Sequence, residues 1–161
     1  EKPVVVAAQG NCYGAGLEMA VSCDFRFCVP EVRFGLPEVH IGVIPGSGGT
    51  SRLTRLVGPA WGKWLAMAGQ RVSAEEALRM GLVHAVFPTG EFMDRVYAFC
   101  RDLISIPAEV LGLAKLAVDV HADVQDRTVQ RHVDRIIISG IMDSPEFDAR
   151  TSRFRKEDGT A

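Results

Sequence analysis

The stretch that decides the fold lies at the start of the chain, where residues 3–24 read PVVVAAQGNCYGAGLEMAVSCD. Residues 3–8 are apolar and rich in β-branched side chains, and Gly10 follows them, which is typical of a buried strand. From Gly14 to Cys23 the apolar residues fall mostly on one side of a helix. A buried strand that leads through small residues into a helix predicts an α/β fold.

The segments further along continue the α/β pattern. Residues 25–29 predict a second strand, and short extended pieces are expected at 33–34 and 38–41, around Gly35 and Pro37. The remaining expected elements are a glycine-rich loop at 45–49, a helix that stops at Gly58, a helix at 59–68, a helix opened by a Ser73–Glu76 capping box and ended by Gly81, and a strand at 83–87.

The rest of the chain shows only the helical spacing of apolar residues. We therefore expect an α/β part over residues 1–90 and a helical module over residues 91–161, with no linker or low-complexity segment between them. The chain begins at Glu1 instead of Met, almost directly before a strand, which suggests a part cut from a longer protein.

Charge and composition exclude several classes of function. The 161 residues carry 18 Lys and Arg against 20 Asp and Glu, a net charge of -2, so nothing favours binding to nucleic acid or to an anionic membrane surface. No apolar run approaches the roughly 20 residues that span a bilayer, and no signal peptide is visible. The four cysteines form no C-x-x-C pair and the four histidines are scattered, which predicts no metal site. The expectation is a cytoplasmic protein with reduced thiols.

Glu18 stands one turn into the first expected helix, behind Gly14, Ala15 and Gly16. Small residues at a helix start let a ligand approach the free N–H groups there, and these groups favour a developing negative charge. The same residues also fit a tight strand-to-helix turn with no chemical role.

Glu38 follows Phe34-Gly35-Leu36-Pro37 and has apolar neighbours on both sides. It lies either at a surface bend or in an apolar pocket, where burial would let it hold or exchange a proton near neutral pH. Twenty residues separate it from Glu18, with a strand between them. This spacing allows two carboxylates to meet in one cavity and share the work on one water molecule.

Several ordered motifs resemble the signature of the crotonase (enoyl-CoA hydratase/isomerase) superfamily. The resemblance is continuous from about residue 2 to about residue 90 and weaker through the helical tail. The matching segments are KPVVVAAQG (2–10), GAGLE (14–18), CD (23–24), FGLPE (34–38), GVIPGSGGTSRL (42–53), GQRVSAEEA (69–77) and GLV (81–83).

The resemblance implies a partial superhelix of repeated β-β-α turns with a carboxyl-terminal helical module for trimer contacts. It implies that Ala15 donates one of two oxyanion N–H groups, that Glu18 activates water and that Glu38 protonates the α-carbon. Asp24 matches an architectural position. Substrate contacts are implied for Tyr13, Gly14, Leu36, Pro45 and Gly46.

The partners implied by the resemblance are an acyl-CoA thioester and further copies of the chain, as a trimer or a dimer of trimers. Coenzyme A is part of the substrate, so no separate cofactor is expected. In the family, the second oxyanion donor and most of the adenine pocket lie well upstream of the segment that this chain matches.

Three functions remain open at this point. Hydration of a 2-enoyl-CoA would need both glutamates. Isomerisation, or another lyase or hydrolase reaction on an acyl-CoA, is the alternative on the same scaffold, and isomerases often dispense with one carboxylate. A truncated subunit that only oligomerises is the third possibility.

Overall fold

The structure is a computed structural model that describes residues 2–123, 126–142, 145, 147–149 and 151–152. It divides into two compact units. The first is Pro3–Ser105, and the second holds Lys2 together with the chain from Ile106 onward.

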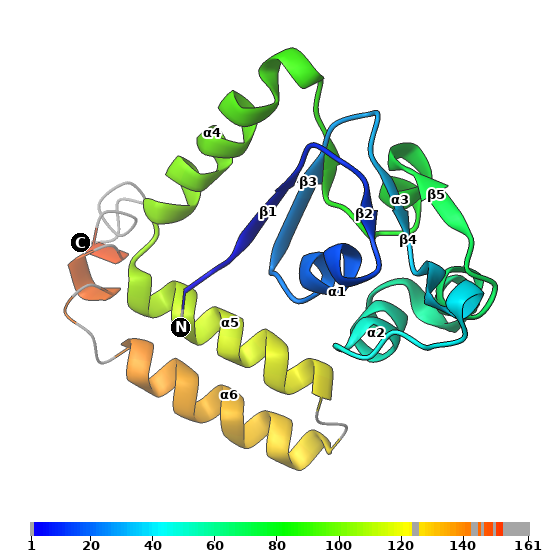
Figure 1. The fold of residues 1–161 in the computed structure, drawn as a ribbon. Helices are drawn as coiled ribbons and strands as arrows, with labels where there is room; N and C mark the ends of the chain where they lie inside the picture. Colours follow the sequence, from blue (N-terminus) through cyan, green and yellow to red (C-terminus); the bar gives the residue numbers. More distant parts are fainter. Residues whose placement is uncertain (1, 124–125, 143–144, 146, 150, 153–161) are drawn as a thin grey trace. The chain divides into compact units, whose positions relative to one another are not determined.

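A parallel three-stranded sheet forms one layer of the first unit (Figure 1). Its strands are β1 (Val5–Ala8), β3 (Phe25–Cys28) and β6 (Ala85–Val86), with β3 in the centre. Ala7 pairs with Phe27, and Phe27 pairs with Ala85. The predicted strands at 3–8 and 25–29 are confirmed, whereas the strand expected at 83–87 is only two residues long.

A second three-stranded sheet combines β2 (Cys12–Tyr13), β4 (Arg33–Gly35) and β5 (Arg71–Ser73). β2 runs parallel to β4, and β5 runs antiparallel to it. Gly35 therefore lies between Tyr13 and Arg71 in register, and the Arg71 guanidinium lies 4.7 Å from the centre of the Tyr13 ring. β2 and β5 were not predicted from the sequence.

The helices of the first unit are short. α1 (Ala15–Val21) and α2 (Gly49–Gly62) pack against each other (Figure 1). α2 breaks at Gly58 and is followed by η2 (Lys63–Met67), a π-helical turn. α3 (Ala74–Arg79) begins at the predicted Ser73–Glu76 capping box. A 3₁₀ turn, η3 (Thr89–Glu91), comes after β6.

The extended piece expected at 38–41 is wrong, because Pro37–Ile41 forms a 3₁₀ helix, η1. Pro37 stands at its first turn, where a fixed φ and a missing N–H cost nothing. Gly42, at φ 79°, ends it in the left-handed conformation that glycine adopts without strain.

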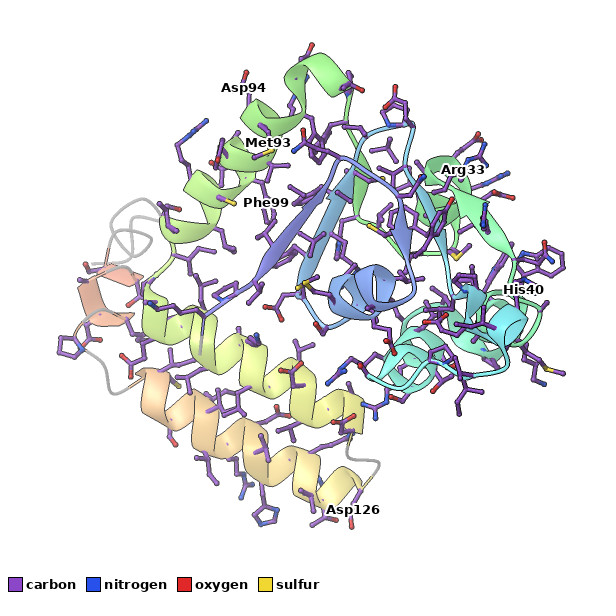
Figure 2. All side chains as sticks on the ribbon, in the orientation of Figure 1. Arg33, His40, Met93, Asp94, Phe99 and Asp126 are labelled. Carbon is purple, nitrogen blue, oxygen red and sulfur yellow. The ribbon has the colours of Figure 1, made fainter. Side chains whose placement is uncertain are left out.

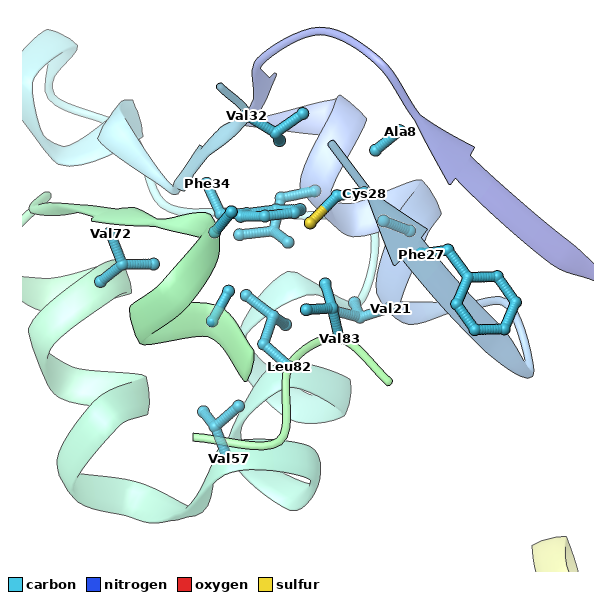
Figure 3. Packing of buried hydrophobic residues seen from close by; sticks show 14 of the residues in the cluster. Ala8, Val21, Phe27, Cys28, Val32, Phe34, Val57, Val72, Leu82 and Val83 are labelled. Atoms are coloured by element: carbon cyan, nitrogen blue, oxygen red, sulfur yellow. The ribbon is translucent and has the colours of Figure 1, made fainter. Parts of the chain in front are cut away.

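The core of the first unit lies between the two sheets and the helices around them (Figure 3). Its largest fully buried side chains include Phe34, Leu17, Leu53 and Leu82, which come from β4, α1, α2 and the segment before β6. One contiguous cluster thus joins both sheets.

The first unit also includes α4 (Phe92–Ile104). Phe92 and Val96 are buried in the core. Phe99, labelled on α4 in Figure 2, has a ring that meets those of Phe25 and Phe27 edge-on at 4.9 and 5.0 Å. The boundary between the two compact units therefore falls after Ser105.

Two helices make up most of the described part of the second unit. α5 (Ala108–Asp123) and α6 (Arg127–Met142) lie side by side (Figure 1). His121 Nε2 lies 2.8 Å from Asp134 Oδ1 between them. Within the described ranges, no helix combines the length and the apolar character needed to cross a membrane.

Candidate active site

Gly14 fixes the start of α1. Its N–H donates to Gly35 O at 3.0 Å, which ties the end of β2 to β4, and its carbonyl accepts from Glu18 N at 3.0 Å. Gly14 has φ 53° and ψ -124°, a conformation that side chains rarely tolerate. The glycine predicted at this turn is therefore required by the backbone, and it orients the helix that carries Glu18.

Glu18 is 6% exposed and its carboxylate is held by a loop. Oε1 accepts hydrogen bonds from Ser47 N at 2.7 Å and from Gly49 N at 2.9 Å. A Cβ placed on Gly49 would lie 2.8 Å from Glu18 Oε1 and 2.9 Å from Pro45 Cβ, so the loop closes on the carboxylate only because residue 49 is glycine. Two backbone donors on one oxygen stabilise the negative charge and fix its direction.

Glu38 comes to the same helix start from η1. A Cβ placed on Gly14 would lie 3.2 Å from Glu38 Oε1. Glu38 Oε2 is buried and accepts no hydrogen bond from the residues that the structure describes. An unpartnered buried carboxylate oxygen is costly, and such atoms occur where a ligand or substrate supplies the partner.

The two carboxylates thus flank one helical turn. Glu38 lies against Gly14, at the beginning of the turn, and Glu18 stands at its end, with its amide bonded to the Gly14 carbonyl. Ala15 lies between them as the exposed first residue of α1. Its N–H belongs to the first turn, where amides have no acceptor within the helix.

The other predicted contact residues lie in different surroundings. Tyr13 is half-buried next to Gly14, Pro45 is buried and Gly46 is exposed. Leu36 is fully buried in the core, and no part of it is exposed within the chain. The sequence did not point to the Ser47 and Gly49 amides as ligands of Glu18, and the glycine-rich composition of this loop was the one available signal.

A cavity of about 370 Å³ opens beside this site. Its lining includes Val39, which follows Glu38, and Pro45 and Thr50, which flank the loop that holds Glu18. The wall is mostly apolar. The site therefore combines two carboxylates, a helix start with available N–H groups and an apolar cavity.

The thiols near the sheets are not suited to nucleophilic catalysis. Burial raises the pKa of Cys28 to about 12, with a further contribution from Cys12, and burial also raises the pKa of Cys12. Both thiols are therefore protonated near neutral pH. Among the described residues, no three His, Cys, Asp or Glu side chains are grouped to hold a metal ion.

The geometry defines a candidate acid–base site in a mixed α/β scaffold, the class of site that moves protons at a polarised carbonyl compound. The chain belongs to the enoyl-CoA hydratase/isomerase family, whose model matches residues 1–156.

Curated relatives carry related names. A short-chain-enoyl-CoA hydratase of Clostridium acetobutylicum is 42% identical over 74% of this chain and 46% of its own length. A crotonyl-CoA hydratase of Syntrophomonas wolfei is 38% identical over 84% and 49%. A carnitinyl-CoA dehydratase of Salmonella paratyphi A is 39% identical over 72% and 45%. This chain therefore spans about half the length of these relatives.

Solved structures confirm the predicted fold class. An enoyl-CoA hydratase from Bacillus anthracis matches with a TM-score of 0.87 and 29% identity, over 96% of this chain and 60% of that one. An enoyl-CoA hydratase/isomerase from Cupriavidus metallidurans matches with a TM-score of 0.91 and 26% identity, over 96% and 58%. The chain thus has part of the crotonase-type fold, with a helical carboxyl-terminal part.

Proposed function

We propose that this protein is an enoyl-CoA hydratase, which adds water across the 2,3-double bond of an enoyl-CoA thioester. The observation that carries the proposal is the position of Glu18 and Glu38 on either side of one helical turn. Hydration needs one group to take a proton from water and another to supply a proton to carbon.

The roles follow from the surroundings of each carboxylate. Glu18, fixed by two backbone amides, takes a proton as the water oxygen bonds to C3. Glu38, whose Oε2 accepts no hydrogen bond from the described residues, delivers a proton to C2. The double-bond electrons form the new C2–H bond, so the thioester gains the elements of one water molecule. The proton that Glu18 has taken passes through solvent to Glu38 before the next turnover, which restores both carboxylates. Coenzyme A belongs to the substrate, and no further cofactor takes part.

The thioester carbonyl is expected to lie at the start of α1. The Ala15 N–H donates to its oxygen, which draws electron density from C3 and stabilises the negative charge that develops during water attack. The surroundings of the acyl group in this proposal are Tyr13, Gly14, Leu36, Pro45 and Gly46. Family members supply a second N–H donor to the thioester oxygen from an upstream loop. Hydration is therefore to be assayed with the full-length gene product.

The helical part is proposed to form contacts between copies in a trimer or a dimer of trimers. Apolar side chains on its helices support this assignment, since Val118 on α5 is 68% exposed and Ile136 on α6 is 73% exposed within the chain. The cytoplasmic location expected from the sequence stays a prediction.

Crotonyl-CoA provides the direct test. The conjugated enoyl-thioester absorbance should decay when the full-length protein is added, and Glu38→Gln should abolish the decay. A folded protein that binds coenzyme A thioesters and leaves the absorbance unchanged would instead favour isomerisation on the same scaffold.

A further inference from the structure

Residues 69–71 contact both elements that carry the candidate site. This segment follows η2 and runs into β5, which begins at Arg71. Its last residue reaches the end of β2, directly before α1, and its first residue reaches η1, which carries Glu38. Two peptide units separate the first and last Cα atoms, which therefore lie at most about 7 Å apart. A link this short leaves little freedom between the two contacts.

The contact with β2 runs across Gly35. A Cβ placed on Gly35 would lie 3.1 Å from Gln70 O and 3.3 Å from Arg71 Cγ, so the aliphatic part of Arg71 occupies the space that a side chain would need. The Arg71 guanidinium then reaches the Tyr13 ring, 4.7 Å from its centre. A guanidinium at this distance is attracted by the negative face of the ring. Arg71 thereby holds Tyr13 against β4.

Tyr13 leads directly into α1. It is the last residue of β2, and Gly14, which follows it, donates its N–H to Gly35 O at 3.0 Å. Ala15 then opens α1 with an N–H that belongs to the first turn. A shift of Tyr13 away from β4 would carry Gly14 and the Ala15 amide with it. The contact with Arg71 therefore fixes the direction of the proposed oxyanion donor.

The contact with η1 runs through Gly69. His40 Nε2 lies 3.2 Å from Gly69 O, and because a carbonyl oxygen only accepts, Nε2 is the donor. Gly69 has φ 62°, and a Cβ placed there would collide with His40 Nε2 and lie 2.9 Å from Val39 Cγ2. The segment therefore packs on η1 only because residue 69 is glycine. His40 stands two residues after Glu38, so this hydrogen bond holds the turn that carries the carboxylate.

The segment is itself anchored to the rest of the first unit. Gln70 N donates to Trp64 O at 3.2 Å. Val72, the next residue after Arg71, is fully buried and pairs with Phe34 of β4. The backbone that links the two contacts is therefore held in place from both ends.

Hydration demands an accurate separation between the Ala15 N–H and Glu38. In the reaction proposed above, the first binds the thioester oxygen and the second protonates C2. That oxygen and C2 are bonded to the same carbon atom, so the substrate cannot adapt to a change in the distance between the two groups. A misplacement of about 1 Å can cost on the order of 10²-fold in rate.

We propose that the 69–71 segment sets this separation, with Arg71 and His40 as positioning residues that act through Tyr13 and Glu38, respectively. The inference rests on the function proposed above. Loss of the Arg71 guanidinium should loosen the oxyanion donor, and loss of the His40 donor should displace the carboxylate. The two changes should therefore alter different properties of the bound thioester.

The carbonyl stretching band of bound butyryl-CoA, labelled with carbon-13 at C1, reports on the start of α1. This thioester has no double bond to hydrate, and its band moves to lower frequency when N–H groups polarise the carbonyl. In difference infrared spectra of the full-length protein, Arg71→Met should move the band most of the way back to its frequency in water. Arg71→Lys, which keeps a cation on an aliphatic stem but not the planar group, should give a smaller change.

Arg33→Met is the matched control for Arg71→Met. Arg33 is an exposed arginine of the same sheet, labelled in Figure 2, and it pairs with Ser73 instead of Gly35. Its replacement removes the same charge and should leave the band unchanged. Tyr13→Leu removes the ring from the other side of the contact, so it should shift the band as Arg71→Met does and serves if that variant does not fold.

Exchange of the C2 hydrogens of butyryl-CoA with solvent deuterium reports on Glu38. In this exchange the C2–H bond breaks, its proton passes to Glu38, its electron pair moves towards the carbonyl oxygen, and a deuteron then returns to C2. His40→Leu should slow the exchange by roughly tenfold to a hundredfold and leave the carbonyl band in place. His40→Gln, whose amide can still donate to Gly69 O, should restore most of the rate.

Three results would overturn the inference. One is a carbonyl band in Arg71→Met that matches the band in Arg33→Met, and another is an unchanged exchange rate in His40→Leu. The third is an unmodified protein that neither shifts the band nor exchanges the C2 hydrogens, because nothing would then be positioned. Failure of crotonyl-CoA hydration together with the expected shifts and rates would reject only the proposed reaction.

Discussion

The surroundings of Glu18 and Glu38 differ although the two residues flank the same helical turn. Glu18 is enclosed by the 45–49 loop, which directs two backbone amides at one carboxylate oxygen. Glu38 lies on a 3₁₀ turn against Gly14, with a buried oxygen that accepts no hydrogen bond from the described residues. Two amides orient the first carboxylate, whereas one oxygen of the second has no hydrogen-bond partner among the described residues. The difference suits a base that orients water and an acid that gives up a proton.

Replacing each carboxylate by its amide should produce the largest effects. Glu18→Gln and Glu38→Gln are each expected to lower kcat by roughly 10²–10⁴, the usual contribution of a general acid or base. Crotonyl-CoA hydration by the full-length protein measures this loss. Wild-type turnover in either variant would remove that residue from the mechanism.

The same two variants should differ in stability. Glu18→Gln removes charge from an acceptor of two amides and should lower the free energy of unfolding by about 1.5–3 kcal/mol. Glu38→Gln breaks no hydrogen bond at Oε2, which accepts none from the described residues, and should leave Tm nearly unchanged. Thermal unfolding of both variants checks the contrast, and equal shifts would mean that the two surroundings do not differ as described.

Gly49→Ala tests whether the 45–49 loop must stay closed on the Glu18 carboxylate for stability and turnover. The new Cβ would lie within 3 Å of Glu18 and Pro45, so we expect a loss of about 1–3 kcal/mol in stability and a fall in kcat. Gly90→Ala is the control, because a Cβ on Gly90 meets no atom within 4 Å. A Gly49→Ala protein with normal stability and turnover would show that the loop can move away from Glu18 without consequence.

Glu76, a carboxylate outside the site, also accepts hydrogen bonds, and it allows an effect on stability to be separated from an effect on catalysis. Glu76 Oε2 accepts from Ser73 N at 2.8 Å and from Ser73 Oγ at 2.9 Å. These bonds hold the pKa of Glu76 below its usual value, so their contribution is present near neutral pH and is lost as the pH falls through the lowered pKa. Ser73→Ala should lower Tm at neutral pH and leave kcat unchanged. A large loss of kcat in a stable variant would contradict a purely structural role for this cap.

The smallest expected effect is a pH dependence of stability at His84. The Arg26 amide donates to His84 Nδ1 at 3.1 Å, and burial followed by the nearby Arg26 charge lowers the pKa of His84. The folded state therefore favours neutral His84. Its contribution to stability is present above the unfolded pKa of about 6.5 and is lost as the pH falls through the lower folded value.

His84→Gln should remove this part of the decline in stability between pH 7 and pH 5 without shifting the pH profile of hydration. Chemical denaturation at several pH values measures the first effect, and crotonyl-CoA assays measure the second. An unchanged stability profile would exclude His84 as its source.

The elements that could be predicted from the sequence are those marked by a pattern of side chains. The sequence predicted the strands at 5–8 and 25–28 and the capped helix at 74–79. Apolar runs mark the strands, and the Ser73–Glu76 capping box marks the start of the helix. β2 and β5 have two and three residues, too few for a pattern, and depend on pairing with β4.

In the candidate site too, the sequence indicated side chains but not backbone groups. Glu18, Glu38 and Ala15 were identified from motifs, but the amides of Ser47 and Gly49 that hold Glu18 are backbone groups without a side-chain signature. Pro37 was noted beside an expected extended piece, yet the 3₁₀ helix that begins there depends on the tertiary setting that brings Glu38 to Gly14.

A double-mutant cycle on crotonyl-CoA hydration tests the central claim most directly, namely that Glu18 and Glu38 act on one water molecule in one reaction. Glu18→Gln, Glu38→Gln and the double variant are compared with the unmodified full-length protein. Residues that act as a unit show strongly non-additive losses, so the double variant should be little slower than the slower single variant. Losses that multiply would contradict the account, because they would show that the two carboxylates act independently.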